Sequence, residues 1–184
     1  MAMLKNRKTA IIITIVVVIL ATLLGVRKSL NQLARDVEAM FYDGVPLEEG
    51  YTQRALSAHL GNCADASLGL ATLLNGYNEL ADDAEALLSA RRELLAATSI
   101  RGKYAAYASM QASFAALTEK AGGMQLTDRD NDAMGQYSST FSGAGTAIQE
   151  SKYNEKALSF MDGASFIAKI LKPLAIVRSP QTFK

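Results

Sequence analysis

The sequence is poor in the residues that most often carry out catalysis or bind metals. Its 184 residues include one cysteine, one histidine and no tryptophan. A single cysteine, Cys63, cannot form an internal disulfide, and with His59 it supplies only two of the four ligands of a structural zinc site. The two residues are four positions apart, so on a helix they could approach each other as nucleophile and base. A small buried side chain is the simpler interpretation of Cys63.

Proline and net charge are also scarce, and both absences limit the classes of protein. There are three prolines, and the formal net charge is only +1, which offers no electrostatic basis for binding nucleic acid. Alanine, leucine and glutamate are plentiful, whereas valine and isoleucine are concentrated near the N-terminus. This composition predicts an all-α protein outside that first segment.

The one long apolar run is Thr9–Val26, which contains no charged residue. Its 18 residues would span roughly 27 Å as a helix, close to the thickness of the hydrocarbon core of a bilayer. We therefore predict an uncleaved, single-pass signal anchor; a cleaved signal peptide and a buried core helix are the alternatives. The chain is then a protein of the cell membrane, with the lipid bilayer as its first partner.

The charges beside this run predict its orientation. Lys5, Arg7 and Lys8 precede it, whereas Arg27 and Lys28 follow it. A small excess of positive charge on the N-terminal side favours a cytoplasmic N-terminus and an extracytoplasmic bundle.

The stretch from Leu56 to Leu95 repeats apolar residues every seven positions, which is typical of a helix packed against other helices. We predict one long central helix that begins near Pro46 and runs to about Ala97, with a kink or break at its glycines as the alternative. The three seven-residue tracks are Leu70, Tyr77, Ala84 and Arg91; Leu73, Leu80, Leu87 and Leu94; and Leu74, Ala81, Leu88 and Leu95.

Local signals set the other expected boundaries. The anchor helix should continue to Asp43-Gly44, and a further helix should run from Ile100 to Gly122-Gly123. A last long helix, capped by Thr127, should extend to Asp162-Gly163. These signals predict an antiparallel bundle of three to four long helices with coiled-coil-like packing. We divide the chain into an anchor (1–28), a bundle (29–163) and an apolar tail (164–184) that packs on the bundle or on a membrane surface.

No pattern in the sequence predicts an active site. Asp128, Asp130 and Asp132 begin like a calcium-binding loop, but such a loop needs glycine at its sixth and glutamate at its twelfth position, which here are Ala133 and Ser139. Acidic residues at the start of a helix, where they complement its dipole, explain these aspartates better. We therefore expect no enzyme activity, no cofactor and no metal site.

The central and last helices resemble those of the LemA family. The motif runs from Leu60 through Asp65 and Leu70 to Gly76-Tyr77, and a later Tyr153-Asn154 and a terminal aromatic, Phe183, are similar to the end of the family's pattern. The resemblance covers most of the chain, although Asn62-Cys63 replaces the family's arginine pair and Ser67–Gly69 its Ile-Pro-Asn. It implies a bacterial, membrane-bound helical bundle with no catalytic activity to transfer. The motif residues themselves are expected to be structural.

Two functions fit these expectations. The first is a non-catalytic membrane protein whose bundle serves as an envelope scaffold or docking module for other membrane or envelope proteins, with a homo-oligomer also compatible. The second is an extracytoplasmic four-helix sensor that binds a ligand and acts through a partner protein.

Overall fold

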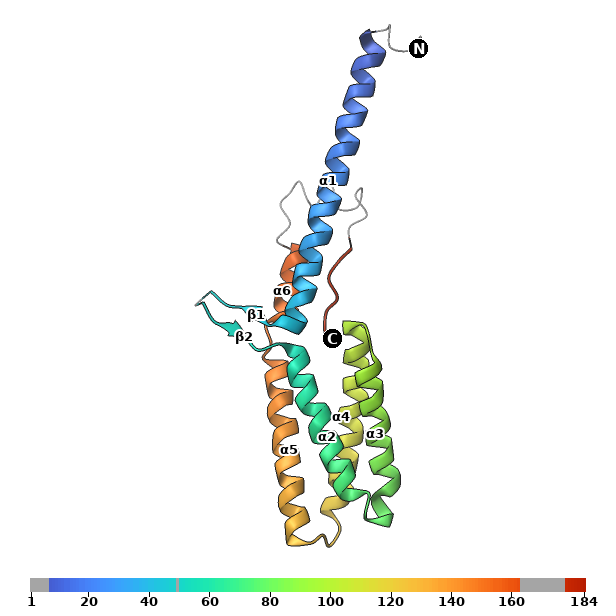
Figure 1. Cartoon of the computed structure of the whole chain (residues 1–184), viewed down its shortest axis with the longest axis vertical. Helices are drawn as coiled ribbons and strands as arrows, with labels where there is room; N and C mark the ends of the chain where they lie inside the picture. The colour runs from blue at the N-terminus through green and yellow to red at the C-terminus, as the bar shows by residue number, and fades with distance from the viewer. Residues whose placement is uncertain (1–6, 49, 163–177) are drawn as a thin grey trace. The chain divides into compact units, whose positions relative to one another are not determined.

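The computed structural model describes residues 7–48, 50–162 and 178–184 (Figure 1). The chain divides into two compact units, which are described separately. The first contains residues 1–38 and 157–180, and the second contains residues 39–156 and 181–184. The helix α1 (Arg7–Asp43) and the helix α6 (Tyr153–Asp162) each contribute to both units.

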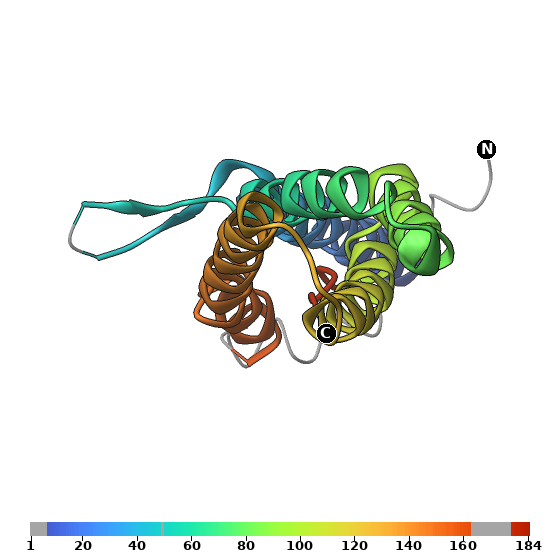
Figure 2. The same ribbon diagram turned by 90° about the horizontal axis from the view of Figure 1, so that it is seen from below.

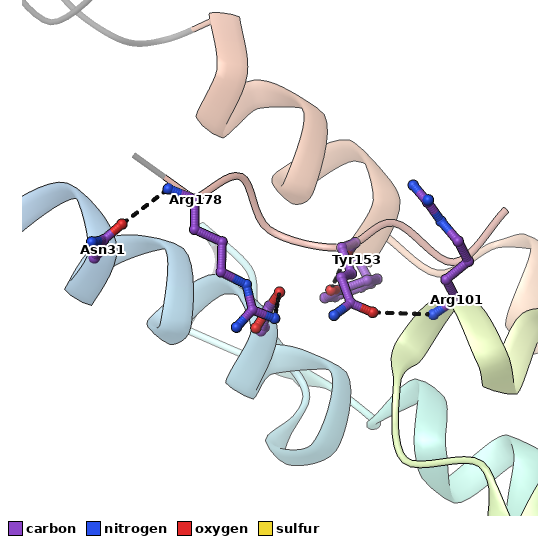
Figure 3. Close-up of polar contacts among 6 residues, drawn as sticks. Asn31, Arg101, Tyr153 and Arg178 are labelled. Atoms are coloured by element: carbon purple, nitrogen blue, oxygen red, sulfur yellow. Dashed lines mark hydrogen bonds and ion pairs between the residues drawn. The ribbon is translucent and has the colours of Figure 1, made fainter. Parts of the chain in front are cut away.

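In the first unit, α1 is long and apolar enough to cross a membrane, and the side chains of its apolar stretch are not buried by protein. The hydroxyls of Thr14 and Thr22 donate hydrogen bonds to backbone carbonyls one turn earlier, so these two polar groups are satisfied within the helix. Further along α1, the side chain of Asn31 accepts a hydrogen bond from the backbone N–H of Arg178 at 3.0 Å (Figure 3). The Arg178 guanidinium also pairs with Glu38 at 3.3 Å.

In the second unit, the end of α1 is followed by a short hairpin, in which β1 (Val45–Pro46) pairs antiparallel with β2 (Thr52–Gln53). Gly44 ends α1 with a φ of +97°, and a Cβ there would lie 2.4 Å from the carbonyl oxygen of Gln53. Only glycine fits this close turn between helix and strand. The predicted end of α1 is therefore confirmed, but Pro46 lies in a strand and does not begin a helix.

Four helices follow the hairpin: α2 (Leu56–Leu74), α3 (Ala81–Ala96), α4 (Ile100–Gly122) and α5 (Asp128–Gln149). Figure 2 shows them side by side in the order α5, α2, α3, α4. Their shared core contains fully buried leucines from α2 and α3 together with Tyr107 and Phe114 of α4 and Phe141 of α5. The all-α class, the bundle and the end of α4 at Gly122-Gly123 are thus confirmed.

The predicted central helix is in fact two helices. The helix α2 ends at Leu74, a turn and a short 3-10 helix (Asn78–Leu80) follow, and α3 packs back against α2. Asn75 and Gly76 are poor helix formers, and the hydroxyl of Tyr77 is held by Asp130 of α5. Because the chain reverses here, the seven-residue tracks do not share one face: Leu74 and Leu87 are buried, whereas Leu95 is 54% exposed.

The predicted last helix is likewise broken, between α5 and α6. The side chain of Gln53, at the base of the hairpin, accepts a hydrogen bond from the Lys152 N–H at 2.8 Å and donates one to the Glu150 carbonyl at 3.3 Å. It thereby satisfies backbone groups that the break leaves without helical partners. The Ser151 hydroxyl accepts from the Tyr153 N–H at the start of α6.

The expectation for the apolar tail falls largely outside the described residues, which exclude 163–177. The described end of the tail does pack on the bundle: Phe183 is only 4% exposed.

Candidate functional site: a groove between α4 and α5

The four helices are arranged in an arc, and α4 and α5 are its two ends (Figure 2). These two helices face each other but do not pack closely. The space between them is an open groove of about 620 Å³. Its lining comprises, from α4, Gln111, Phe114, Ala115, Thr118 and Glu119, and, from α5, Ser138, Phe141, Ser142, Gly145, Thr146 and Gln149.

Two aromatic rings form the base of this groove. Phe114 and Phe141 stack with their ring centroids 4.0 Å apart and their planes at 18°, and both side chains are buried. They bridge α4 and α5 where the backbones stay apart. Small and uncharged polar side chains line the walls, and Glu119 is the one charged residue among them. The groove therefore suits an uncharged, partly apolar ligand more than an ionic one.

Two hydroxyls in this region, those of Tyr107 and Ser138, are buried and find no oxygen or nitrogen partner among the described residues. Burial raises the pKa of Tyr107, and the adjacent Cys63 thiol raises it further. Burial also raises the pKa of Cys63, to about 11, and the Cys63 thiol lies 3.8 Å from the carbonyl oxygen of Phe141. A thiol with this pKa is almost entirely protonated at neutral pH and is a poor nucleophile.

The C-terminal residues 181–184 lie at one end of this region and are held by three hydrogen bonds to their backbone and one to the side chain of Gln181. The side-chain amide of Asn154 donates to the carbonyl of Phe183 at 2.8 Å and accepts from its N–H at 2.7 Å. The Tyr153 hydroxyl donates to the Gln181 carbonyl at 2.5 Å, and the Arg101 N–H donates to the Gln181 side chain at 3.3 Å (Figure 3). We call this arrangement of Arg101, Tyr153 and Asn154 the clasp.

The side chain of Phe183 enters an aromatic pocket beside the clasp. Its ring centroid lies 5.2 Å from that of Tyr104, 5.9 Å from that of Tyr107 and 5.8 Å from that of Phe41. Such spacings are typical of favourable aromatic pairs, and the near-complete burial of Phe183 adds a hydrophobic contribution. Backbone hydrogen bonds together with one side-chain pocket are the elements by which proteins recognise extended peptides.

The clasp and the groove adjoin each other. A second hollow of about 320 Å³ is lined by Phe183 and Asn154 at one side and shares Gln111 and Gln149 with the groove. Along α4, the tail meets Arg101 first, then Tyr104 and Tyr107, and the groove begins at Gln111. The tail therefore points along α4 toward the groove, and Phe183 lines the adjoining second hollow and not the groove itself.

The motif residues singled out in the sequence fall into separate places. In α2, Leu60 and Leu70 are buried in the core and Asp65 is exposed. Gly76 and Tyr77 form the turn before α3, far along the chain from the clasp that contains Tyr153 and Asn154. The structure thus brings only the last two together with the groove.

Tyr77 links the α2–α3 turn to the start of α5. Its hydroxyl donates to the Asp130 carboxylate at 2.5 Å, which lowers the pKa of Asp130 and raises that of Tyr77. The predicted cap of α5 is confirmed as well, since the Thr127 hydroxyl accepts from the Asp130 N–H at 3.2 Å.

The interpretation of Cys63 as a small buried side chain is confirmed, and the alternative, a pair with His59 as nucleophile and base, has no hydrogen bond to support it among the described residues. Burial and the nearby Arg54 lower the pKa of His59, and the thiol of Cys63 is directed to the carbonyl of Phe141 instead. Sequence reasoning missed the groove, the partly buried state of the Asn154 amide and the core position of Phe183. The one available signal was the terminal aromatic in the family resemblance.

Comparison of the chain with protein-family models, with curated proteins and with solved structures finds no match. The class that the fold defines is an all-α helical bundle preceded by a helix able to cross a membrane. Membership of the LemA family stays a prediction from the motif residues.

Proposed function

We propose that this chain is a non-catalytic, single-pass membrane protein whose bundle is a docking module for other membrane or envelope proteins, in the manner expected of the LemA family. The observation that supports the proposal is the open groove between α4 and α5, in a bundle whose other neighbouring helices pack closely. A groove with an aromatic base and uncharged walls suits a protein segment with apolar side chains.

The anchor in this proposal is the apolar part of α1, with its N-terminus in the cytoplasm and the bundle outside. A cysteine at Lys184 in a Cys63→Ser background tests the orientation in intact cells with a membrane-impermeant maleimide. Labelling of intact cells agrees with the proposal. Labelling only after lysis would place the bundle in the cytoplasm and move its partners there.

Photo-crosslinking tests the docking role directly. A photoreactive amino acid at Ala115, in the groove, should form a discrete adduct with a membrane or envelope protein in cells, whereas one at the neighbouring Ala116, outside the groove lining, should not. Ser142→Trp, which fills the groove from α5, should abolish the adduct. Equal adducts from both positions, or an adduct indifferent to Ser142→Trp, would remove the support for docking at this groove.

A second function, a ligand-binding sensor that acts through a partner protein, is favoured by one observation. The groove volume is within the range of small-molecule pockets, and the buried hydroxyl of Ser138, which finds no hydrogen-bond partner among the described residues, belongs to a residue of the groove lining. A thermal-shift screen of small polar and amphipathic compounds distinguishes the two: a rise in Tm that Ser138→Ala removes supports the sensor. A flat screen with a groove-dependent crosslink supports docking.

A further inference from the structure

The clasp has the properties of a peptide-binding site that the chain itself occupies. Asn154 makes a reciprocal pair of hydrogen bonds with the backbone of Phe183, and Tyr153 binds the backbone of Gln181. These contacts read the extended backbone and not its side chains, so they tolerate many sequences. The one strong side-chain requirement is the aromatic ring in the pocket of Tyr104, Tyr107 and Phe41.

The described tail residues 181–184 do not line the adjoining groove, which is therefore open to a longer ligand. The chain passes Arg101, Tyr104 and Tyr107 in that order, and the groove continues along α4 from Gln111 to Glu119. Eight helical residues rise roughly 12 Å, which about four residues of extended chain would span. A segment that carried a phenylalanine into the clasp and continued in the same direction would cover the stacked aromatic base.

We propose, on the basis of the docking function above, that the partner presents an extended segment whose backbone binds the clasp and whose phenylalanine enters the aromatic pocket beside it. About four small or apolar residues of the same segment then occupy the groove. The tail of this chain is the resident ligand, and the partner segment displaces it. Tethering gives the tail a high effective concentration at the clasp. The longer segment overcomes that advantage through the groove contacts that residues 181–184 do not make.

The test uses the full chain in detergent and two fluorescent peptides. The short peptide is the sequence of residues 178–184, RSPQTFK, and the long one is RSPQTFK followed by Leu-Ala-Leu-Ala. The receptor carries Phe183→Ala, which vacates the aromatic pocket, and circular dichroism checks its fold. We expect this receptor to bind both peptides, the long one at least about tenfold more tightly, and we expect the wild-type chain to bind only the long one.

Matched variants assign the binding to the clasp and the groove separately. Alanine in place of the peptide's phenylalanine, or Asn154→Ala in the receptor, should weaken binding of both peptides at least about tenfold. Asn154→Asp keeps the acceptor and loses the donor, so it should fall in between. Ser142→Trp should remove only the advantage of the long peptide, and Thr140→Trp, on α5 but outside the groove lining, should leave it intact.

Three results would overturn this inference: no binding of either peptide to the folded receptor, equal affinity for the two peptides, or binding that ignores the phenylalanine. A wild-type dimer that Phe183→Ala dissociates would also overturn it, because the occupant would then be the tail of a second copy. The crosslink from Ala115 is independent of these peptides. Docking therefore stands if the crosslink forms and the peptides fail, and docking fails if the crosslink is absent.

Discussion

Replacement of Leu74 by aspartate is the most direct test of the packing of α2. Leu74 is at the C-terminal end of α2 and is fully buried. Truncation of a buried leucine costs about 2–5 kcal/mol, through the lost transfer free energy and the cavity that remains. A carboxyl group without a hydrogen-bond partner in that space adds about 1–3 kcal/mol. The free energy of unfolding should therefore fall by about 3–8 kcal/mol, which approaches the whole stability of many domains.

Leu68 provides the matched control, because it is on the same helix and is 41% exposed. Leu68→Asp should cost no more than about 1 kcal/mol, most of it from the lower helix propensity of aspartate. Urea unfolding of the full chain in a mild detergent, followed by far-ultraviolet circular dichroism, measures both variants. If Leu74→Asp unfolds at the same urea concentration as Leu68→Asp, the face of α2 that we describe as buried is wrong.

Three further predictions concern α2 and its turn. In the same urea experiment, Gly69→Ala should lower the free energy of unfolding by about 1–3 kcal/mol, because the new methyl group would meet the ring of Tyr137 on α5. Gly61→Ala, whose methyl group would lie in open space, should leave the stability unchanged or raise it by up to about 1 kcal/mol. Cys63 should not react with a thiol reagent at pH 8 until the chain is unfolded, as a colorimetric thiol assay with and without urea would show. Tyr77→Phe should lower Tm throughout the range from about pH 4 to 10 and have less effect well outside that range; a difference that is constant with pH would contradict the hydrogen bond to Asp130.

The pH range of the last prediction follows from the two pKa shifts. The folded chain lowers the pKa of Asp130, so the bond stabilises fully above the unfolded value near 4 and is lost as the pH falls through the folded pKa. It raises the pKa of Tyr77, so the stabilisation is complete below the unfolded value near 10 and is lost as the pH rises through the higher folded pKa.

Several elements could be predicted from the sequence because short-range chemistry determines them. The length and apolarity of the first segment predict a helix able to span a bilayer. The end of α1 depends on Gly44, whose positive φ few other residues adopt, and the start of α5 on the Thr127 hydroxyl, which binds a backbone N–H three residues later. In each case the causal residues are within about one helical turn of the boundary.

The site could not be predicted in the same way, because its contacts join residues far apart in the chain. The break between α5 and α6 depends on Gln53, almost a hundred residues earlier, and the turn after α2 on a bond from Tyr77 to Asp130. A seven-residue repeat is the same in one long helix as in two helices that pack back on each other, so periodicity could not reveal the reversal at Gly76.

The sequence by itself determined the helical class, the first helix that is long and apolar enough to span a membrane, and the local caps, since these depend on the composition and spacing of neighbouring residues. Only the tertiary structure decided that α4 and α5 stay apart, that Phe183 is a core residue and that Asn154 binds backbone instead of water. Burial and hydrogen-bond partners are properties of surfaces brought together by folding, and no local pattern specifies which distant residue will occupy a given space.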